Sequence, residues 1–479
     1  MAFALILIPL GLALLAFIIP SNFKRPLLLP FAAVFHLILS ILAVANPTPP
    51  EPGVWLALDP PGRVVLLLVS VLFFFVSFYG VGYLRHRDNR DNRVFVSCVL
   101  SFLAGMSLVA WSRHLGLGWV AIEATTLAGA PLIYFNRNQR SLEATWKYLI
   151  LGSIGIALAL LGTFFLGYAA LSGGSEPSLF YDDLIRIGPV MSSAWLNAAF
   201  VLMLVGYGTK MGLAPMHTWK PDAYGEAPGF AGALFAGGMT SCAFLTLLRM
   251  LHLCDAADTG EFPRQALIAL GLLSMGVAAV FVLRQRDFKR MLAYSSIEHM
   301  GILAIALGIG KAATFGALLH LVNNGLAKGV MFLAAGNIHR AWGSKSTSKV
   351  GGVMRRLPIT GALFLAGFLA VTGSPPFGPF MSEFWIINSA FATGHIAVAV
   401  LFLLFLLVIF IGMGSTVLPL VQGLPTPPIE GTRPYRETFL TTAPMLGLMA
   451  FVLMLGLWIP GPLRSLLDEA VVYLEVVKP

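Results

Sequence analysis

The chain has 479 residues, of which 57% are apolar and only 11% are charged, whereas a soluble domain usually has about 25% charged residues. Its mean hydropathy is +0.83. These values exclude an ordinary cytosolic enzyme, a disordered protein and a nucleic-acid binder. The net charge of +9 does not indicate phosphate binding, because the basic residues lie in short loops between apolar runs. The three cysteines form no CxxC or Cys/His cluster, so we expect no disulfide framework and no metal site.

Fourteen apolar runs along the chain have the length of membrane helices, since a bilayer core needs about 20 apolar residues per helix. The loops between the runs are short, and the longest covers residues 172–193. The sequence therefore predicts an all-α polytopic membrane protein with about 14 transmembrane helices. The predicted spans are 2–20, 26–46, 62–84, 94–112, 115–134, 145–171, 194–219, 228–252, 264–283, 292–309, 312–338, 358–391, 394–420 and 438–460.

The basic residues predict how the chain is oriented. Of the 31 lysines and arginines, 20 lie in one set of alternate loops, and 7 lie in the other set and the C-terminal tail. Lys220 is counted in the basic set, as part of the loop between the seventh and eighth spans. Cytoplasmic loops carry the excess of basic residues, so both termini are predicted on the outer, periplasmic side of a bacterial inner membrane. The other four lie within spans, and among them Arg249 is expected to anchor its helix at the outer interface, beside an acidic loop.

Two of the predicted spans contain helix breakers. The seventh span contains Gly212-Leu-Ala-Pro215, and the twelfth contains Gly373-Ser-Pro375-Pro376. Proline removes a helix hydrogen bond, and the carbonyl that it frees inside a bilayer needs another partner. Broken helices at matching places in two halves indicate an inverted-repeat transporter and the location of its ion path. The alternative is a pair of proline kinks that only shape packing.

Several ionisable side chains fall inside the spans, where each is expensive and therefore a functional candidate. His320, Asn324 and Lys328 recur every four residues, which places them in one polar stripe on a helix. Carboxylates and lysines that tune each other, with histidines that titrate near neutral pH, are the groups that proton relay requires. The candidates for proton translocation are Glu123, Lys147, Lys210, His299, His320, Lys328 and Glu383, and the secondary candidates are His217, Glu298, Asn324 and Ser241.

Some of these residues have a plainer interpretation. Lys147 could form a surface pair with Glu143 at the inner interface, because lysine readily extends to the interface. His299 and Glu298 could be structural residues that satisfy local packing and hydrogen bonding. His217, with Asp222 and Glu226 nearby in the sequence, could cap a short half-helix instead of carrying protons.

Four segments carry a resemblance to a known family. They are KMGLAPMHTWKPDAYGEAP (210–228), RDFKRMLAYSSIEHMG (286–301), HLVNNGLAKGVMFLAAGNI (320–338) and GSPPFGPFMSEF (373–384). They resemble the antiporter-like subunits of respiratory complex I, multi-subunit sodium/proton antiporters and membrane-bound hydrogenases. The segment 141–163 and the IEHMG sequence look closest to component F of hydrogenase-4 and formate hydrogenlyase complexes.

The resemblance implies a particular architecture. It implies 14 core helices, with N-terminal helices in 1–93, a first inverted five-helix repeat in 94–252, a second in 253–420, and the last helix with a short tail in 421–479. It also implies two half-channels that are joined by a central polar axis.

The resemblance also implies residue roles. Glu123 corresponds to the family's fifth-helix glutamate and Lys210 to its partner lysine on the broken seventh helix. Lys147 matches the sixth-helix lysine, and Glu383 corresponds to the terminal carboxylate on the broken twelfth helix, where some relatives carry lysine. The residues that fall in the central axis are His299, His320 and Lys328.

The chain departs from the family pattern at a few positions. Ser241 stands where many relatives place an eighth-helix lysine, so the central relay must use other groups or water. Asn324 stands at the place of a second histidine in the eleventh helix. Lys220 stands where relatives usually carry leucine, and Tyr224 replaces a frequent histidine.

The resulting hypothesis is a proton-translocating membrane subunit of a redox-driven complex of the hydrogenase-4 or complex I type. No phosphate-binding loop or catalytic triad is recognisable, so we expect no cofactor, metal or redox centre in this chain and electron transfer in hydrogenase-like or quinone-reductase-like peripheral subunits. Other membrane subunits and the lipid bilayer are the expected neighbours, and nucleic acid is not. The alternatives are a subunit of a multi-subunit sodium/proton antiporter and a membrane subunit of an inorganic-carbon uptake complex.

Overall fold

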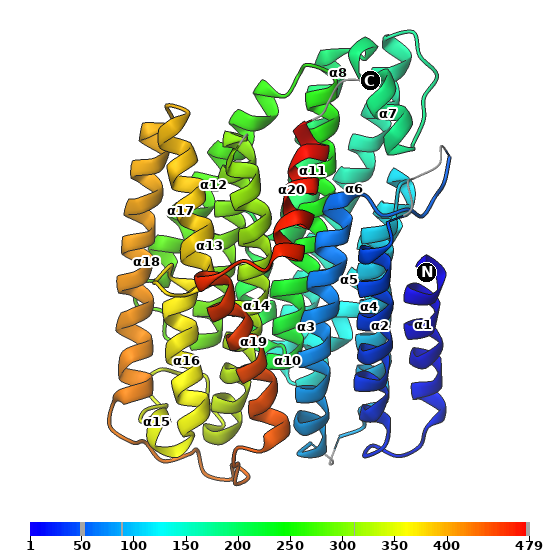
Figure 1. Ribbon diagram of the computed structural model, residues 1–479. Coiled ribbons are helices and arrows are strands. Elements are labelled where there is room, and N and C mark those ends of the chain that lie inside the picture. The colour runs from blue at the N-terminus through cyan, green and yellow to red at the C-terminus, as the bar shows by residue number, and fades with distance from the viewer. Residues whose placement is uncertain (48–52, 88–89, 311, 476–479) are drawn as a thin grey trace.

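The computed structural model describes residues 1–47, 53–87, 90–310 and 312–475. Within these ranges the protein is a helical bundle without a β-strand, and every apolar run predicted from the sequence is helical over most of its length. The helices, labelled as in Figure 1, are α1 (Ala2–Ile18), α2 (Leu28–Ala45), α3 (Pro60–Arg85), α4 (Arg93–Trp111), α5 (Leu115–Ile133), α6 (Gln139–Ser172), α7 (Tyr181–Ile187), α8 (Ser193–Met211), α9 (Trp219–Glu226), α10 (Gly229–Leu234), α11 (Thr240–Ala256), α12 (Glu261–Val282), α13 (Phe288–Ile309), α14 (Ala312–Trp342), α15 (Val353–Arg356), α16 (Pro358–Val371), α17 (Gly378–Ala392), α18 (Ile396–Gln422), α19 (Phe439–Leu457) and α20 (Gly461–Glu475).

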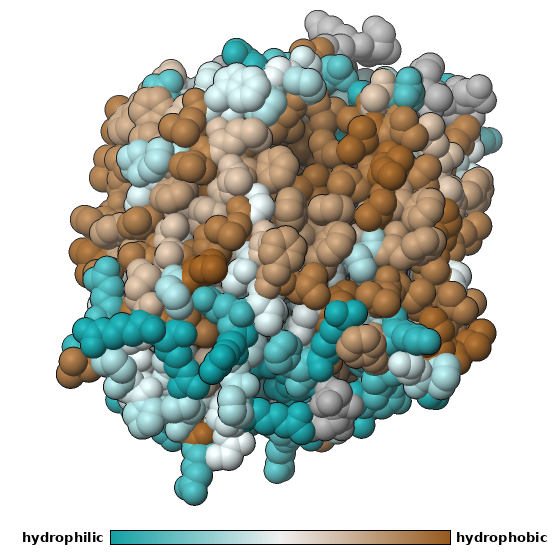
Figure 2. Space-filling view, turned by 60° about the horizontal axis from the view of Figure 1, so that its bottom comes forward, coloured by the Kyte–Doolittle hydropathy of each residue, from teal (hydrophilic) through white to brown (hydrophobic). Residues whose placement is uncertain are grey.

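The composition of the helices makes this a multi-pass membrane protein. In the described ranges, 11 helices are long and apolar enough to cross a membrane. The predicted spans outside that set are the 17-residue α1 and the two interrupted segments, α8 and α16–α17. The face of the bundle seen in Figure 2 is largely apolar, with a hydrophilic zone at its lower end. An apolar surface of this extent is what lipid tails solvate.

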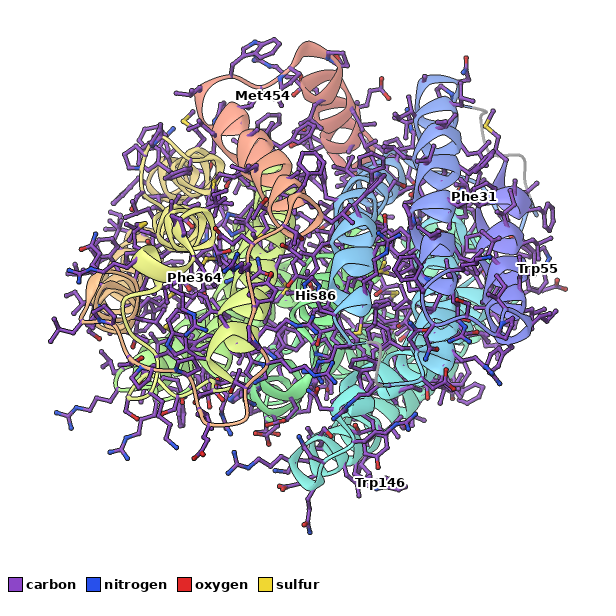
Figure 3. The ribbon with its side chains drawn as sticks, turned by 90° about the horizontal axis from the view of Figure 1, so that it is seen from below. Phe31, Trp55, His86, Trp146, Phe364 and Met454 are labelled. Atoms are coloured by element: carbon purple, nitrogen blue, oxygen red, sulfur yellow. The ribbon has the colours of Figure 1, made fainter. Side chains whose placement is uncertain are left out.

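The centre of the bundle consists of α10–α11, α13 and α14. The most apolar window of each of these spans is 100% buried, against 28% for α18. The N-terminal helices α1 and α2 and the long helix α18 lie at opposite ends of the bundle, both from the side and from below (Figures 1 and 3). A side chain on the central helices is therefore screened from lipid by the surrounding helices.

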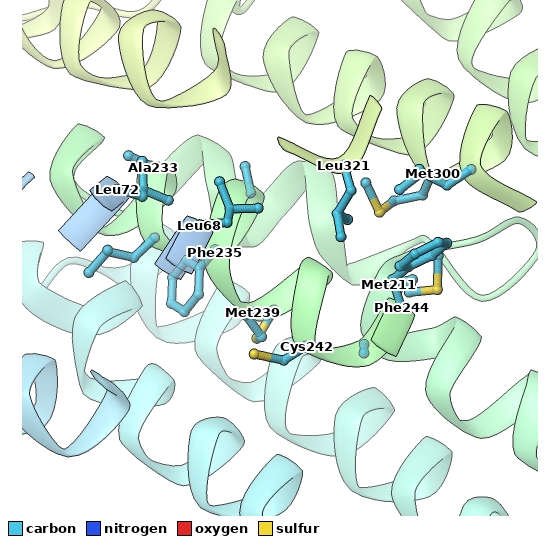
Figure 4. Close-up of a cluster of buried hydrophobic side chains, with 14 of the residues drawn as sticks. Leu68, Leu72, Met211, Ala233, Phe235, Met239, Cys242, Phe244, Met300 and Leu321 are labelled. Carbon is cyan, nitrogen blue, oxygen red and sulfur yellow. The ribbon is translucent and has the colours of Figure 1, made fainter. Parts of the chain in front are cut away.

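Small residues allow the backbones of the central helices to lie in direct contact. A π-helical turn, Phe235–Met239, joins α10 to α11, and a Cβ added at Gly237 in that turn would lie 2.9 Å from the carbonyl oxygen of Gly325 on α14. Leu72 and Leu68, two members of the buried apolar cluster in Figure 4, border this contact. This close contact holds α14, which carries the predicted polar stripe, directly against α10 and α11.

Both predicted helix interruptions are present. Helix α8 ends at Met211, and Gly212 then adopts φ +79°; helix α16 ends at Val371, and Gly373 adopts φ +66°. The left-handed conformation is accessible to glycine without steric cost, which is why each break begins at a glycine. The peptide bonds before Pro215 and Pro376 are both cis. The chain resumes as the short helix α9 after the first break and as α17 after the second.

Arg249 is buried and pairs with a carboxylate of the N-terminal region, not with the acidic loop beside it in the sequence. Its Nε and Nη2 atoms each lie 2.8 Å from a carboxylate oxygen of Asp59, and Arg113 Nη1 lies 2.8 Å from the same carboxylate. Asp255 of the acidic loop pairs with Arg264 instead, at 2.7 Å. The guanidinium of Arg249 is thus part of a buried ion cluster that joins the start of α3 to α11.

The segment after the last predicted span is more ordered than a short tail. It forms α20, whose apolar residues Leu466, Leu467, Ala470 and Leu474 are buried. This helix packs against α3 and ends near α11 in Figure 1. Its last turn brings Tyr473 within hydrogen-bonding distance of Arg113, at 3.3 Å.

Candidate functional site

Lys210 lies at the first break, one residue before α8 ends. Its side chain is buried, and its Nζ atom is 3.5 Å from the hydroxyl oxygen of Tyr148 on α6. The same nitrogen is 4.6 Å from the centre of the Tyr148 ring. A cation over an aromatic face gains some stabilisation, but a long hydrogen bond to one hydroxyl is weak support for a buried ammonium.

Glu123 lies on α5, across a narrow gap from Lys210. It is half-buried and accepts hydrogen bonds from Thr126 Oγ1 at 2.9 Å and Ser153 Oγ at 3.3 Å. Gly152 on α6 lies between the two: a Cβ there would lie 3.2 Å from Thr126 and 3.3 Å from Lys210 Nζ. Because Gly152 has no side chain, the Lys210 amine has room beside Thr126, which donates a hydrogen bond to Glu123.

Glu383 lies on α17, just after the second break. Its side chain is buried, and a Cβ added at Gly373 would lie only 2.0 Å from its Oε2 atom. The glycine of the break thus gives the carboxylate room beside the backbone. The preceding residue, Ser382, has its Oγ 3.0 Å from Nδ1 of His320 on α14.

A pair of histidines continues from this point towards the centre. Nε2 of His320 is 2.9 Å from Nδ1 of His299 on α13, and both rings are completely buried. Each imidazole has one nitrogen that donates and one that accepts when it is neutral. His299, His320 and Ser382 therefore form a hydrogen-bonded chain from α13 to α17.

The centre of the bundle holds a lysine and a carboxylate that share one hydroxyl. Nζ of Lys328 donates to Oγ of Ser295 at 2.6 Å, and that hydroxyl is 3.3 Å from Oε2 of Glu298. All three side chains are completely buried. Ser295 lies one turn before His299 on α13, so this group adjoins the histidine pair.

His299, His320 and Glu383 also have the composition of a metal-binding group. One ligand atom from each lies within 4.8 Å of the others. The two facing ring nitrogens of the histidines lie 2.9 Å apart, which is hydrogen-bond distance. In this structure the two rings therefore share a hydrogen bond.

Four sequence candidates lie apart from this chain of contacts. Lys147 is half-exposed and pairs with Glu143 at 2.6 Å and with Asp222 at 2.9 Å, as the plainer interpretation expected. Asp222 and Glu226 form ion pairs with Arg290 and Lys345. The other three candidates are His217, which is half-buried, Ser241, whose hydroxyl donates to the Gly237 carbonyl, and Asn324, whose buried amide has no partner in the described ranges.

Lys220 is a buried residue that the sequence placed in an inner loop. The structure corrects this: Lys220 lies on α9 and is completely buried. Its Nζ donates to the carbonyl oxygen of Met211 at 2.6 Å. The sequence signal was a lysine five residues after the proline of the break. The prolines and charged residues around it favour a solvent-exposed loop, which is why the sequence does not predict its burial.

Comparisons with known proteins agree with this architecture. Residues 112–412 match the family model described as NADH:quinone oxidoreductase/Mrp antiporter, TM. The hydrogenase-4 component F homolog of Methylacidiphilum infernorum is 35% identical over 418 residues, which cover 85% of this chain and 86% of the relative.

Two solved structures share the fold over almost the whole length. A chain of the membrane-bound sulfane sulfur reductase, an archaeal respiratory membrane complex, matches with a TM-score of 0.88 at 22% identity and covers 99% of this chain and 98% of its own. A chain of respiratory complex I from Thermus thermophilus matches with a TM-score of 0.78 at 29% identity and covers 95% of this chain and 97% of its own. Both neighbours are subunits of multi-subunit membrane complexes.

Proposed function

The chain belongs to the NADH:quinone oxidoreductase/Mrp antiporter membrane family, and on that premise we propose that it is the proton-translocating membrane subunit of a redox-driven complex. The observation that carries the proposal is the set of buried titratable groups between the two helix breaks. Lys210 adjoins the first break, Glu298 and Lys328 occupy the centre, and Glu383 adjoins the second break. Ionisable groups this deep in a membrane are expensive and are retained where they serve transport.

The first half of the path uses Glu123 and Lys210. An ionised Glu123 favours the ammonium form of Lys210, and a weaker interaction between them favours release of its proton. Tyr148 and Thr126 hold the two groups in adjacent positions without joining them in a direct ion pair. The charge state of Lys210 can therefore change without breaking a strong contact.

The second half uses the histidine chain. A proton that arrives at one ring nitrogen of His299 can leave from the other, because imidazole carries protons on both nitrogens. The 2.9 Å contact to His320 and the 3.0 Å contact from His320 to Ser382 continue the chain toward α17. Glu383, next to Ser382, is the terminal acceptor in this proposal.

The detailed architecture is part of the proposal. Fourteen spans would include α1 and the two interrupted segments, with inverted repeats in 94–252 and 253–420. Support comes from the two breaks, each of which begins with a left-handed glycine three residues before a proline. The basic inner loops support an orientation with both termini on the periplasmic side of a bacterial inner membrane.

Electron transfer would take place in partner subunits. The family relationship supports assembly with other membrane subunits, and hydrogenase-like or quinone-reductase-like peripheral subunits are the proposed redox partners. The chain would respond to their chemistry through charge displacement along its buried axis, since each titratable group biases its neighbour.

The test begins with the native complex. The tagged chain is purified in mild detergent and its partners are identified by mass spectrometry. Inverted membrane vesicles are then supplied with the donor that those partners oxidise, and acidification is followed with a pH-sensitive dye. We expect Lys210→Ala and Glu383→Gln to lower the number of protons moved per electron by about tenfold or more. Lys349→Ala, a change at an exposed lysine, is the matched control and should pump normally.

Three results would contradict the proposal. The first is recovery of antiporter subunits only, with proton movement driven by an imposed sodium gradient and no electron donor, which would establish the sodium/proton antiporter alternative. The second is recovery of a carbonic-anhydrase-like partner, which would favour inorganic-carbon uptake. The third is normal proton-to-electron stoichiometry in both variants, which would leave the chain as a scaffold.

A further inference from the structure

Lys220 is a completely buried lysine that the proton path described above does not use. Its Nζ is 2.6 Å from the carbonyl oxygen of Met211, the last residue of α8. In an uninterrupted helix that carbonyl would accept the N–H of residue 215, but Pro215 has no N–H to donate. The Lys220 amine therefore binds the carbonyl that the broken helix leaves without a partner. That carbonyl belongs to Met211, the residue after Lys210.

The same amine also reaches the centre of the bundle. Its Nζ lies 3.4 Å from the carbonyl oxygen of Ser296 on α13. The neighbouring residue, Ser295, accepts the hydrogen bond of Lys328 at 2.6 Å. Lys220 and Lys328 thus contact adjacent residues of one turn of α13, and Lys220 also binds the backbone of Met211, the residue that follows Lys210.

Helix α11 does not supply a titratable group at the position that the family resemblance pointed to. The hydroxyl of Ser241 donates to the carbonyl oxygen of Gly237 at 2.7 Å, within its own helical segment. It is thereby engaged in a local backbone bond, and a serine hydroxyl does not hold a proton as a lysine does. A connection between Lys210 and Lys328 therefore uses water or a titratable group from another element.

We propose that Lys220 carries the proton between the two halves of the path. The neutral amine of Lys220 accepts, through intervening water, a proton that the ammonium of Lys210 releases. The resulting ammonium then releases that proton to the neutral amine of Lys328, so one N–H bond forms and one breaks at each step. The four-carbon stem lets the amine move between the carbonyls of Met211 and Ser296, and lysine changes its charge state readily when buried.

The plainer role for Lys220 is a structural one, in which its amine only binds freed carbonyls. The chain contains a lysine that does this and lies outside the path. Lys289 is equally buried, and its Nζ donates to the carbonyl oxygens of Gly225, at 2.9 Å, and Ala227. It provides a matched control, because replacing it removes a buried amine that binds backbone carbonyls and leaves the chain of titratable groups intact.

The experiment rests on the proposed function and uses the same native complex in inverted vesicles. Lys220→Gln keeps an N–H donor for the Met211 carbonyl but cannot carry a proton. Lys220→Arg keeps the positive charge and the donors, but a guanidinium does not release its proton in a protein. We expect both variants to lower protons moved per electron by about tenfold or more, and Lys289→Gln to pump normally. Assembly is checked by size-exclusion chromatography and by recovery of the partner subunits.

The outcomes separate this inference from the proposed function. If Lys210→Ala stops pumping and either assembled Lys220 variant pumps normally, the inference is wrong and the proposed function stands. A normal Lys220→Arg with a defective Lys220→Gln would likewise assign Lys220 a purely electrostatic or structural role. If Lys210→Ala and Glu383→Gln also pump normally, the proposed function itself fails.

Discussion

The lysines at the centre of this protein are bound by neutral oxygen atoms. Lys210 contacts a tyrosine hydroxyl, Lys220 contacts backbone carbonyls, and Lys328 contacts a serine hydroxyl. None of the three is part of an ion pair found within the described ranges, whereas the buried Arg249 is held by a carboxylate at 2.8 Å. A buried ion pair strongly favours the charged form of both partners. Hydroxyl and carbonyl partners leave an amine able to lose its proton, which is the property that a relay needs.

Ser295→Ala tests this dependence on a hydroxyl. The substitution removes the 2.6 Å hydrogen bond of Lys328 and the 3.3 Å contact with Glu298. A hydrogen bond to a charged group contributes about 1.5–3 kcal/mol, so we expect the proton-pumping rate to fall about ten- to a hundredfold. The measurement is donor-driven acidification of inverted vesicles. Ser389→Ala is the control, because the Ser389 hydroxyl only bonds its own helix at the Trp385 carbonyl. Equal rates in the two variants would show that Ser295 has no part in the relay.

At the scale of the element, the two interrupted helices are broken in the same way. Each has a left-handed glycine directly after or close to the end of a helix, and each glycine faces an ionisable side chain. A Cβ at Gly212 would lie 2.5 Å from Cδ of Lys220, and one at Gly373 would lie 2.0 Å from Oε2 of Glu383. The breaks therefore do more than bend the chain, since each leaves the space in which a titratable group is held.

Gly373→Ala is predicted to disturb proton transfer through this steric contact. An alanine in the left-handed conformation costs about 1–2 kcal/mol, and its methyl group would also displace the Glu383 carboxylate. Gly394, with φ +82° and no atom within 4 Å of an added Cβ, provides a control with the same strain and no contact. We expect both variants to lose stability in thermal unfolding and only Gly373→Ala to lose pumping in the vesicle assay. A pumping defect of the same size in Gly394→Ala would attribute the effect to strain alone.

The helices could be predicted from the sequence because a bilayer demands long apolar runs, and the breaks because glycine and proline are unmistakable within such runs. The titratable residues Lys210, Lys328 and Glu383 could be found for the same reason, as charges in apolar surroundings. Lys220 could not, because the residues around it are polar and its burial depends on how α9 folds back into the bundle. The partner of Arg249 was also beyond the sequence, since 190 positions separate it from Asp59.

At the scale of the whole molecule, the ion cluster around Asp59 links helices that are far apart in the sequence. This residue caps α3, Arg113 precedes α5, and Arg249 belongs to α11, so the cluster joins the N-terminal helices to the central ones. Burial favours the neutral carboxyl, but the charge and hydrogen bonds of Arg249 and the charge of Arg113 outweigh it and lower the pKa of Asp59 from 3.8 to about 2. Tyr473 on α20 contacts Arg113 from the C-terminal side.

Asp59→Asn should therefore destabilise the fold as a whole. It leaves the buried guanidinium of Arg249 without its carboxylate and Arg113 with only that of Asp182, and breaking a buried ion pair costs about 3–5 kcal/mol. We expect a clearly lower midpoint in thermal unfolding of the detergent-purified protein at neutral pH. Asp468→Asn, which removes an exposed pair with Arg464 at 3.9 Å, is the control and should change the midpoint little.

The pH dependence of this difference follows from the lowered pKa. A carboxyl whose pKa is lower in the folded state stabilises that state fully above its unfolded pKa, and the stabilisation disappears as pH falls through the folded pKa. The advantage of the native protein over Asp59→Asn should therefore be constant above pH 3.8 and shrink toward pH 2, the two pKa values of Asp59. Thermal midpoints measured across that range test it. A difference that stays constant down to pH 2 would mean that the Asp59 charge does not hold this end of the bundle together.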